Sequence, residues 1–228
     1  IYSTQTPYRI KNDYFKRGLH MEMLKTFDHR GNVTGVATRE EIHRLGLWHE
    51  TFHCWIVCRE EGVDYIYLQL RSKNKKDYPN QFDITAAGHL LSIESVEDGV
   101  REVEEELGIE VAFRELESLG VIGYTIISEE LIDKEFAHNF VYKATPTWDA
   151  FTLQTEEVAG IVRTEFSSFM GLWKGNVESI KIEGILINEQ GVRCSIEKNV
   201  GKESFVPHPL DYFEKVLERI EEKLRVTE

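Results

Sequence analysis

Three glutamates at helical spacing are the residues of this sequence best placed to do chemistry. Glu102, Glu105 and Glu106 stand at positions i, i+3 and i+4, so on a helix their carboxylates lie within an arc of roughly 100°. Like charges at this spacing cost about 0.2–0.5 kcal/mol per pair, which a bound cation would relieve. Hard carboxylate oxygens suit Mg²⁺ or Mn²⁺. The alternative is a solvated acidic helix face, which these three residues alone do not exclude.

The flanking residues predict that a helix carries the glutamates, from Ser95 to Leu107. Ser95 is a favourable N-cap, and Asp98 places a negative charge in the first turn. Gly108 suits the left-handed position that ends a helix. Apolar residues recur every three or four positions and predict a stripe that faces a core, away from the carboxylates: Val96, Val100, Val103 and Leu107.

The longer string around this helix resembles a known family motif. It runs Gly88, five residues, Glu94, six residues, and then Arg101-Glu102-Val103-Glu104-Glu105-Glu106-Leu107-Gly108-Ile109. The Nudix box is similar: Gly, five residues, Glu, seven residues, then Arg-Glu-apolar-x-Glu-Glu-x-Gly-apolar. Every specified position of the second half matches. The loop before Arg101 is one residue shorter than in the family, and Ile93 replaces a usual glycine.

The resemblance implies a metal-dependent hydrolase that cuts a diphosphate linkage. By it, Glu102, Glu105 and Glu106 would hold Mg²⁺ or Mn²⁺. Arg101 would brace the loop by pairing with an acidic residue such as Glu94. The metal would neutralise the diphosphate and lower the pKa of a bound water, which attacks phosphorus.

Residues 46–55 and 70–90 resemble a subgroup of Nudix proteins similar to isopentenyl diphosphate isomerase, and the resemblance covers roughly residues 22–145. That isomerase has a second metal site of histidines and acidic residues. The matching positions here hold His49, His89, Asp133 and Glu135, with His43 displaced by one residue. Each histidine has the alternative of being a surface residue or a hydrogen-bonded core residue.

The catalytic cysteine of the isomerase corresponds to Ala87 here. Without a thiol, proton transfer at an allylic carbon loses one of its two acid–base partners, so we expect hydrolysis rather than isomerisation. Glu135 is a candidate general base because the matching strand faces the metal in the isomerase. Its alternative is an exposed strand carboxylate, and Glu105 is the competing base.

Arg71, Lys73, Lys75 and Lys76 form the most basic stretch of an acidic chain. Such a patch attracts phosphate, although a solvated hairpin tip is the alternative. Arg71, at a strand end, and Lys75, which matches a lysine of the relatives, are the candidates for substrate binding. We expect His89, directly after the box glycine, to contact phosphate or metal.

Composition limits the partners. The 228 residues carry a net charge of −13, which argues against binding a nucleic-acid polymer. Bare carboxylates would also repel a phosphate-bearing substrate, and a bound divalent metal would relieve that repulsion locally. The partner that the resemblance implies is a small diphosphate substrate. No apolar run approaches the ~20 residues that span a membrane, and the first residues lack a secretory signal. Three cysteines without CxxC spacing are typical of reduced thiols. We therefore expect a soluble, cytoplasmic protein, with a homodimer left open.

The pattern of elements predicts one α+β domain of Nudix type, a mixed β-sheet sandwiched between helices. We expect residues 1–20 to be an extension or an expression remnant, with Met21 or Met23 near the natural start, and 21–228 to form the domain. Short helices are expected over 38–45 and 95–107, and a C-terminal helix over 210–224. Predicted strands cover residues 23–28, 51–58, 64–70, 82–86, 111–121, 136–143, 158–166, 179–187 and 194–198.

Three functions follow, in order. The first is a Nudix hydrolase acting on a small substrate such as a nucleoside diphosphate derivative. The second is a non-catalytic domain that binds a diphosphate ligand, which the shortened loop motivates. The third is isopentenyl diphosphate isomerase.

Overall fold

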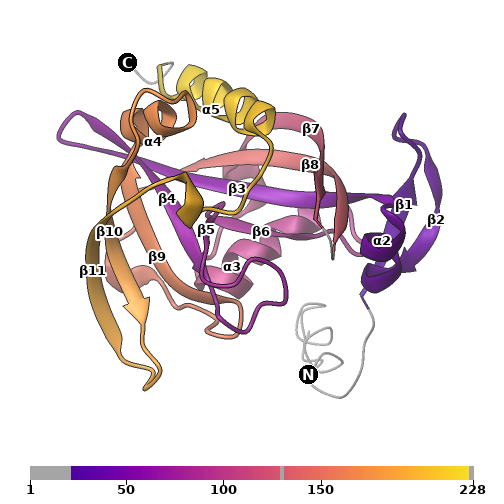
Figure 1. Cartoon of the computed structure of the whole chain (residues 1–228), viewed down its shortest axis with the longest axis horizontal. Coiled ribbons are helices and arrows are strands. Elements are labelled where there is room, and N and C mark those ends of the chain that lie inside the picture. The colour runs from indigo at the N-terminus through magenta and orange to yellow at the C-terminus, as the bar shows by residue number, and fades with distance from the viewer. Residues whose placement is uncertain (1–21, 129–130, 226–228) are drawn as a thin grey trace, which may run out of the picture.

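The computed structural model describes residues 22–128 and 131–225. The predicted extension at residues 1–20 and the start at Met21 lie outside them. The described strands form one 11-stranded mixed sheet (Figure 1). They are β1 (Met23–Phe27), β2 (Val33–Thr38), β3 (Trp48–Glu60), β4 (Val63–Arg71), β5 (Phe82–Asp83), β6 (Ala86–His89), β7 (Glu117–Ile127), β8 (Ile132–Lys143), β9 (Val158–Glu165), β10 (Ile180–Ile187) and β11 (Arg193–Val200).

Four α-helices and four 3₁₀ turns connect the described strands. The helices are α2 (Arg39–Leu45), α3 (Arg101–Leu107), α4 (Phe166–Trp173) and α5 (Leu210–Arg225). The 3₁₀ turns are η1 (Glu97–Val100), η2 (Phe113–Glu115), η3 (Trp148–Ala150) and η4 (Lys202–Ser204). As predicted, Thr38 and Glu41 form a capping box that starts α2.

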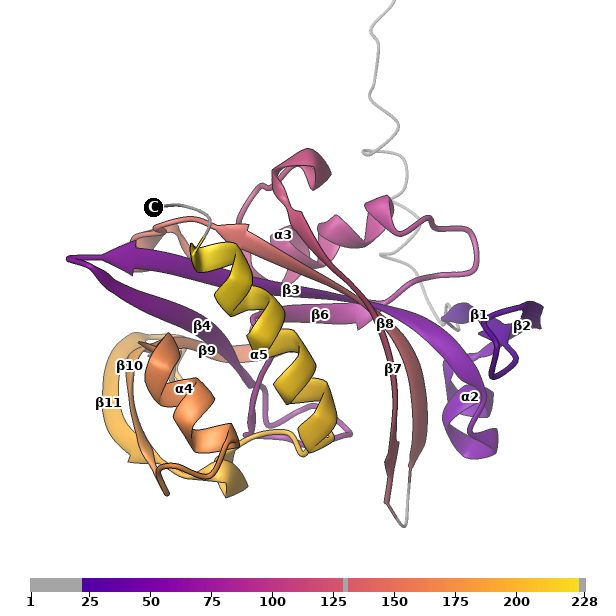
Figure 2. The ribbon, with the colours of Figure 1, turned by 90° about the horizontal axis from the view of Figure 1, so that it is seen from above.

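The 13-residue strand β3 organises the sheet. Its residues from Trp48 to Val57 pair in parallel with β8. On the other edge β3 pairs with β4 only next to their shared turn, between Val57 and Glu60, and with β6 before that. β3 and β4 therefore separate toward the opposite end (Figure 2). There β6 pairs with β3, and β5 pairs with β4 (Figure 1).

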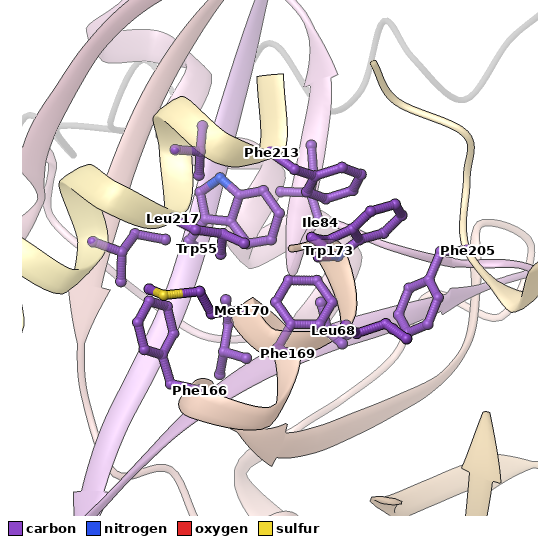
Figure 3. Packing of buried hydrophobic residues seen from close by; sticks show 14 of the residues in the cluster. Trp55, Leu68, Ile84, Phe166, Phe169, Met170, Trp173, Phe205, Phe213 and Leu217 are labelled. Carbon is purple, nitrogen blue, oxygen red and sulfur yellow. The ribbon is translucent and has the colours of Figure 1, made fainter. Parts of the chain in front are cut away.

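Helices cover both faces of the sheet, which confirms the predicted layers. Because side chains alternate along a strand, β3 sends Trp55 to one face and Phe52 to the other. The first face packs against α4 and α5, and the second packs against α3 (Figure 2). Trp173 and Phe213, which belong to α4 and α5, stack with ring centroids 3.8 Å apart in the core (Figure 3).

The structure corrects several predicted elements. The expected helix from Ser95 begins instead as the 3₁₀ turn η1, and the α-helical part is confined to Arg101–Leu107. The Asp98 carboxylate accepts hydrogen bonds from the amide and hydroxyl of Ser95, so Ser95 does not cap a helix with its own oxygen. Gly99 packs directly on Phe52, where an added Cβ would lie 2.7 Å away.

The predicted strand over residues 111–121 is wrong in its first half. The Glu115 carboxylate accepts from the Ala112 amide and closes η2, so strand β7 begins only at Glu117. Strand β2 and helix α4 were not predicted. Five of the eight residues of α4 are buried, and Phe166, Phe169, Met170 and Trp173 recur at helical spacing, so the sequence did carry a signal for this short helix. No described helix is long and apolar enough to cross a membrane.

Candidate active site

A pocket of about 490 Å³ is lined by side chains from α2, β3, β6, α3, β8 and the segment before α5. Its walls therefore combine residues between Glu22 and Glu157 with Val206 and His208 from the segment before α5. The pocket is lined by the main candidates from the sequence for catalysis, substrate binding and metal binding: Arg71, Lys75, His89, Arg101, Glu102, Glu105, Glu106 and Glu135. Of the further positions that match the second metal site of the isomerase, His43 and Asp133 line it and His49 does not.

The three box glutamates differ in their surroundings. The Glu105 side chain is 51% exposed, whereas Glu106 is buried and its Oε2 accepts from the Ala87 amide at 3.1 Å and from Gln69 at 3.2 Å. The alternative of a solvated acidic helix face is therefore wrong for these residues, because Glu106 packs against the sheet. Burial and the neighbouring Glu102 raise the pKa of Glu106 well above its usual range. A buried carboxylate with this pKa favours a nearby cation.

Glu102 lies against the box glycine. A Cβ at Gly88 would lie 2.2 Å from the Glu102 carboxyl carbon, so only glycine leaves room for this carboxylate. Burial and the charges of Glu105 and Glu94 raise the pKa of Glu102 to about 7, although Arg101 acts against them. These crowded carboxylates form a set of hard oxygen donors suited to Mg²⁺ or Mn²⁺.

Arg101 links the helix to the preceding loop, as expected. Its Nε donates to Glu94 at 2.8 Å, and Nη2 donates to the second oxygen of Glu94 at 3.1 Å and to the His89 carbonyl at 3.2 Å. Nη1 pairs with Glu102 at 2.7 Å and with Glu105 at 2.8 Å. The shortened loop therefore still delivers Glu94 to Arg101.

A second group of potential metal ligands lies in the same pocket region. One nitrogen from each of His43, His49 and His89 lies within 4.8 Å of the others, and His49, Asp133 and Glu135 form a second group by the same limit. His43 comes from α2, His49 from β3 and His89 from β6, so three elements converge here. Burial, with help from neighbouring charges, lowers the pKa of His43 to about 4 and that of His89 well below its usual value. Neutral imidazoles are the form that binds metal.

Three buried polar atoms in this cluster have no hydrogen-bond partner among the described residues: Nε2 of His43, Nε2 of His49 and Oδ1 of Asp133. The two nitrogens lie 3.6 and 3.5 Å from the Asp133 oxygen, beyond normal hydrogen-bond length. Buried unsatisfied polar groups cost about 1–3 kcal/mol each. A coordinated cation would satisfy all three, so the residues fit a metal.

The two acidic residues of β8, Asp133 and Glu135, have pKa values shifted in opposite directions. Burial and the adjacent Glu135 raise the pKa of Asp133 to about 9. Burial acts to raise the pKa of Glu135 as well, but contacts with His53 and Tyr124 lower it well below its usual range. Oε2 of Glu135 accepts from Tyr124 at 2.5 Å and from Thr51 at 2.8 Å. Glu135 is therefore a buried carboxylate, and its alternative as an exposed strand residue is wrong.

The basic residues divide into two groups. Arg71 and Lys75 reach the pocket, and Lys75 pairs with Glu157 there. Lys73 pairs instead with Glu189 outside it, with its side chain 60% exposed. Arg39 also lines the pocket and was not predicted, because nothing local distinguishes it from a surface arginine at a helix start.

Other pocket residues were also missed by sequence reasoning. His53 follows His49 and Thr51 by the two-residue spacing of a strand, and its Nε2 lies 3.3 Å from Glu135. That alternation was the one available signal. Tyr124 and His208 line the pocket too, from β7 and from the segment before α5.

Comparisons with known proteins complete the description of this site. No protein-family model matches the chain. The chain is 38% identical over 196 residues to an uncharacterized Nudix hydrolase of Clostridium acetobutylicum, a match that covers 86% of this chain and 95% of that protein. The chain belongs to the Nudix hydrolase family. The expected family is thereby confirmed.

Two further relatives of this Nudix protein cover less of it. Nudix hydrolase 3 of Arabidopsis thaliana is 35% identical over 147 residues, which are 61% of this chain and 18% of the plant protein. The isopentenyl-diphosphate Delta-isomerase of Corynebacterium diphtheriae is 26% identical over 165 residues, 66% of this chain and 82% of the isomerase. The resemblance to the isomerase-like subgroup is also confirmed.

The fold agrees with this assignment. A solved MutT/nudix family protein from Enterococcus faecalis superposes with a TM-score of 0.50 at 12% identity, over 96% of this chain and 70% of that one. The predicted α+β Nudix fold is therefore present.

Proposed function

We propose that this Nudix protein is a metal-dependent hydrolase that cuts a diphosphate linkage in a small substrate such as a nucleoside diphosphate derivative. One observation carries the proposal. The box carboxylates line the same pocket as two cationic side chains, Arg71 and Lys75. The pocket therefore offers metal ligands and phosphate-binding groups together, which a diphosphate requires.

The box residues have distinct parts in this proposal. Glu102, Glu105 and Glu106 would hold Mg²⁺ or Mn²⁺, which supplies charge neutralisation and an activated water when bound. Arg101 holds the helix against the loop through Glu94 and lies against two of the carboxylates. Arg71 and Lys75 would bind phosphate oxygens, with His89 near the metal.

The histidine cluster would hold a second cation. Its support is the set of buried atoms without hydrogen bonds on His43, His49 and Asp133. Glu135 lies beside this cluster, and its ionised carboxylate fits a ligand or a general base. Glu105 competes for the role of base. Its half-exposed carboxylate contacts Arg101, whereas Oε2 of Glu135 is held by Thr51 and Tyr124.

The experiment is a panel of diphosphate-linked compounds incubated with purified protein and Mg²⁺ or Mn²⁺, with phosphate-containing products measured. Glu105→Gln should lower turnover at least a hundredfold. Glu104→Gln is the matched control, because Glu104 is an exposed glutamate of the same helix outside the pocket. Product formation that survives in Glu105→Gln would contradict its assigned role. Binding of a diphosphate without turnover in the unmodified protein would favour the non-catalytic alternative.

The isomerase alternative has a separate test. Ala87 lies in the pocket and carries no thiol, and its amide binds Glu106. Incubation with isopentenyl diphosphate in D₂O should show no proton exchange. Proton exchange would instead favour isomerase activity over hydrolysis.

A further inference from the structure

The segment between β11 and α5 forms part of the pocket wall. Phe205 pairs with Phe82 of β5 through a parallel bridge, and the Val206 amide donates to the Phe82 carbonyl at 2.9 Å. Val206 and His208 then line the pocket. A piece of chain almost a hundred residues beyond the end of the box is therefore held directly beside the site.

His208 makes one specific polar contact there. Its side chain is only 7% exposed, and Nε2 lies 2.8 Å from Oδ1 of Asp83. An ionised carboxylate only accepts, so Nε2 carries the hydrogen of this bond. Nδ1 has no partner within the described residues, which makes the Asp83 bond the single hydrogen bond of the imidazole there.

Asp83 in turn holds Arg71. The second carboxylate oxygen of Asp83 accepts from Nη1 of Arg71 at 3.0 Å. On its other side the guanidinium donates to the Asp77 carbonyl through Nε at 3.2 Å and Nη2 at 2.9 Å. These contacts fix the guanidinium plane and leave one hydrogen on each Nη for a ligand. Burial acts to raise the pKa of Asp83, but His208 and Arg71 outweigh it and lower the pKa to about 2.

We propose that His208 is a positioning residue for substrate binding: through Asp83 it holds Arg71 in the orientation that receives a phosphate group of the substrate. The assignment rests on the proposed function, because it takes Arg71 as a phosphate-binding residue. The Ile84 amide also donates to Oδ1 of Asp83 at 2.8 Å, so donors hold both oxygens of this carboxylate, and His208 adds the side-chain donor on Oδ1. A guanidinium held at both edges loses little freedom when it binds an anion. His208 thereby makes the C-terminal segment necessary for tight substrate binding.

The alternative is that the His208 ring only fills space in the core. The His208 ring lies 5.3 Å from Tyr212 and 5.6 Å from Phe213, so an aromatic ring of similar size would fill the same space. His208→Phe keeps the ring and removes the donor. His208→Gln places an amide nitrogen where Nε2 stands and keeps the donor. The two variants separate packing from the hydrogen bond.

The test is calorimetric binding of methylenediphosphonate, which cannot be hydrolysed, in the presence of Mg²⁺. His208→Phe should weaken binding about five- to twentyfold, and His208→Gln should restore it to within about threefold of the unmodified protein. With a hydrolysable substrate, KM should rise by the same factor while kcat changes less than twofold. In an Arg71→Ala background, His208→Phe should have no further effect.

Three outcomes would overturn the assignment. If His208→Phe binds the phosphonate as tightly as the unmodified protein, the His208 ring serves only to fill space. If His208→Phe still weakens binding in the Arg71→Ala background, His208 does not act through Arg71. Failure of the unmodified protein to bind the phosphonate contradicts the proposed function itself, and the role of His208 falls with it. If His208→Phe does not fold, Asp83→Asn takes its place. The Asp83→Asn substitution keeps the shape of the side chain and removes the negative charge that holds Arg71. It should weaken phosphonate binding to the same extent as His208→Phe.

Discussion

Arg101 and Glu94 form a two-point ion pair, with Nε–Oε1 at 2.8 Å and Nη2–Oε2 at 3.1 Å. Glu94 is 6% exposed, and its Oε2 also accepts from the Leu91 amide at 2.9 Å. The pair therefore ties the loop after β6 to the first residue of α3. The loop is one residue shorter than the family pattern, and the geometry of the pair shows that this shortening is accommodated before α3 begins.

Removal of the guanidinium should destabilise the protein strongly. Arg101→Leu leaves Glu94 buried without its cationic partner, and we expect a loss of about 3 kcal/mol in the free energy of unfolding, measured by urea denaturation. Arg225→Leu is the control, because Arg225 pairs with Glu221 on the surface and should cost less than about 1 kcal/mol. Equal effects of the two substitutions would show that the Glu94 pair is not structural.

A methyl group at the box glycine should disrupt the site. Gly88→Ala places a Cβ 2.2 Å from the Glu102 carboxyl carbon and must displace that carboxylate. We expect kcat to fall at least tenfold and Mg²⁺ to be needed at higher concentration, with the circular dichroism spectrum unchanged. Gly171→Ala is the matched control, since its new methyl group meets nothing closer than 3.7 Å. Normal activity of Gly88→Ala would mean that the position of Glu102 does not matter.

Loss of one histidine should weaken cation binding at the second cluster. His43→Ala removes one of three neighbouring imidazoles from α2, and we expect the Mn²⁺ dissociation constant of one site to rise about tenfold or more. Electron paramagnetic resonance of free Mn²⁺ measures this directly. His29→Ala, at an exposed histidine of the turn after β1, is the control. Identical Mn²⁺ titrations of both variants would rule out a metal role for the cluster.

Acid should remove the contribution of Asp83 to stability. Its pKa of about 2 in the folded protein lies below the ordinary value of 3.8, so its stabilising effect is complete above about pH 5 and is lost as the pH falls through 2. This difference corresponds to about 2 kcal/mol. The gap in unfolding free energy between the unmodified protein and Asp83→Asn should therefore narrow between pH 5 and pH 2.5. For Asp149→Asn, at an exposed aspartate, the gap should stay constant.

The sequence alone determined the parts of this protein that depend on neighbours along the chain. The capping box of α2, the left-handed Gly108 after α3 and the amphipathic α5 depend on residues within a few positions of one another, so their pattern was readable. The same holds for the box, whose spacing identified the family. The turn at Ser95 and the start of β7 were misread, although the bonds of Asp98 to Ser95 and of Glu115 to the Ala112 amide are equally local. At the first of these places the contact of Gly99 with Phe52, which is distant in sequence, also acts.

Only the tertiary structure decided how distant groups share one pocket. The parallel pairing of β3 with β8 places His49 opposite Glu135, and no spacing along the chain encodes that register. Glu106 is buried because α3 packs on the sheet, although its helical position alone indicated an open face. His208 meets Asp83 across 125 positions of sequence, because the chain returns beside β5 before α5 begins. Burial and pairing over such distances arise from the packing of the whole sheet, which local sequence patterns do not contain.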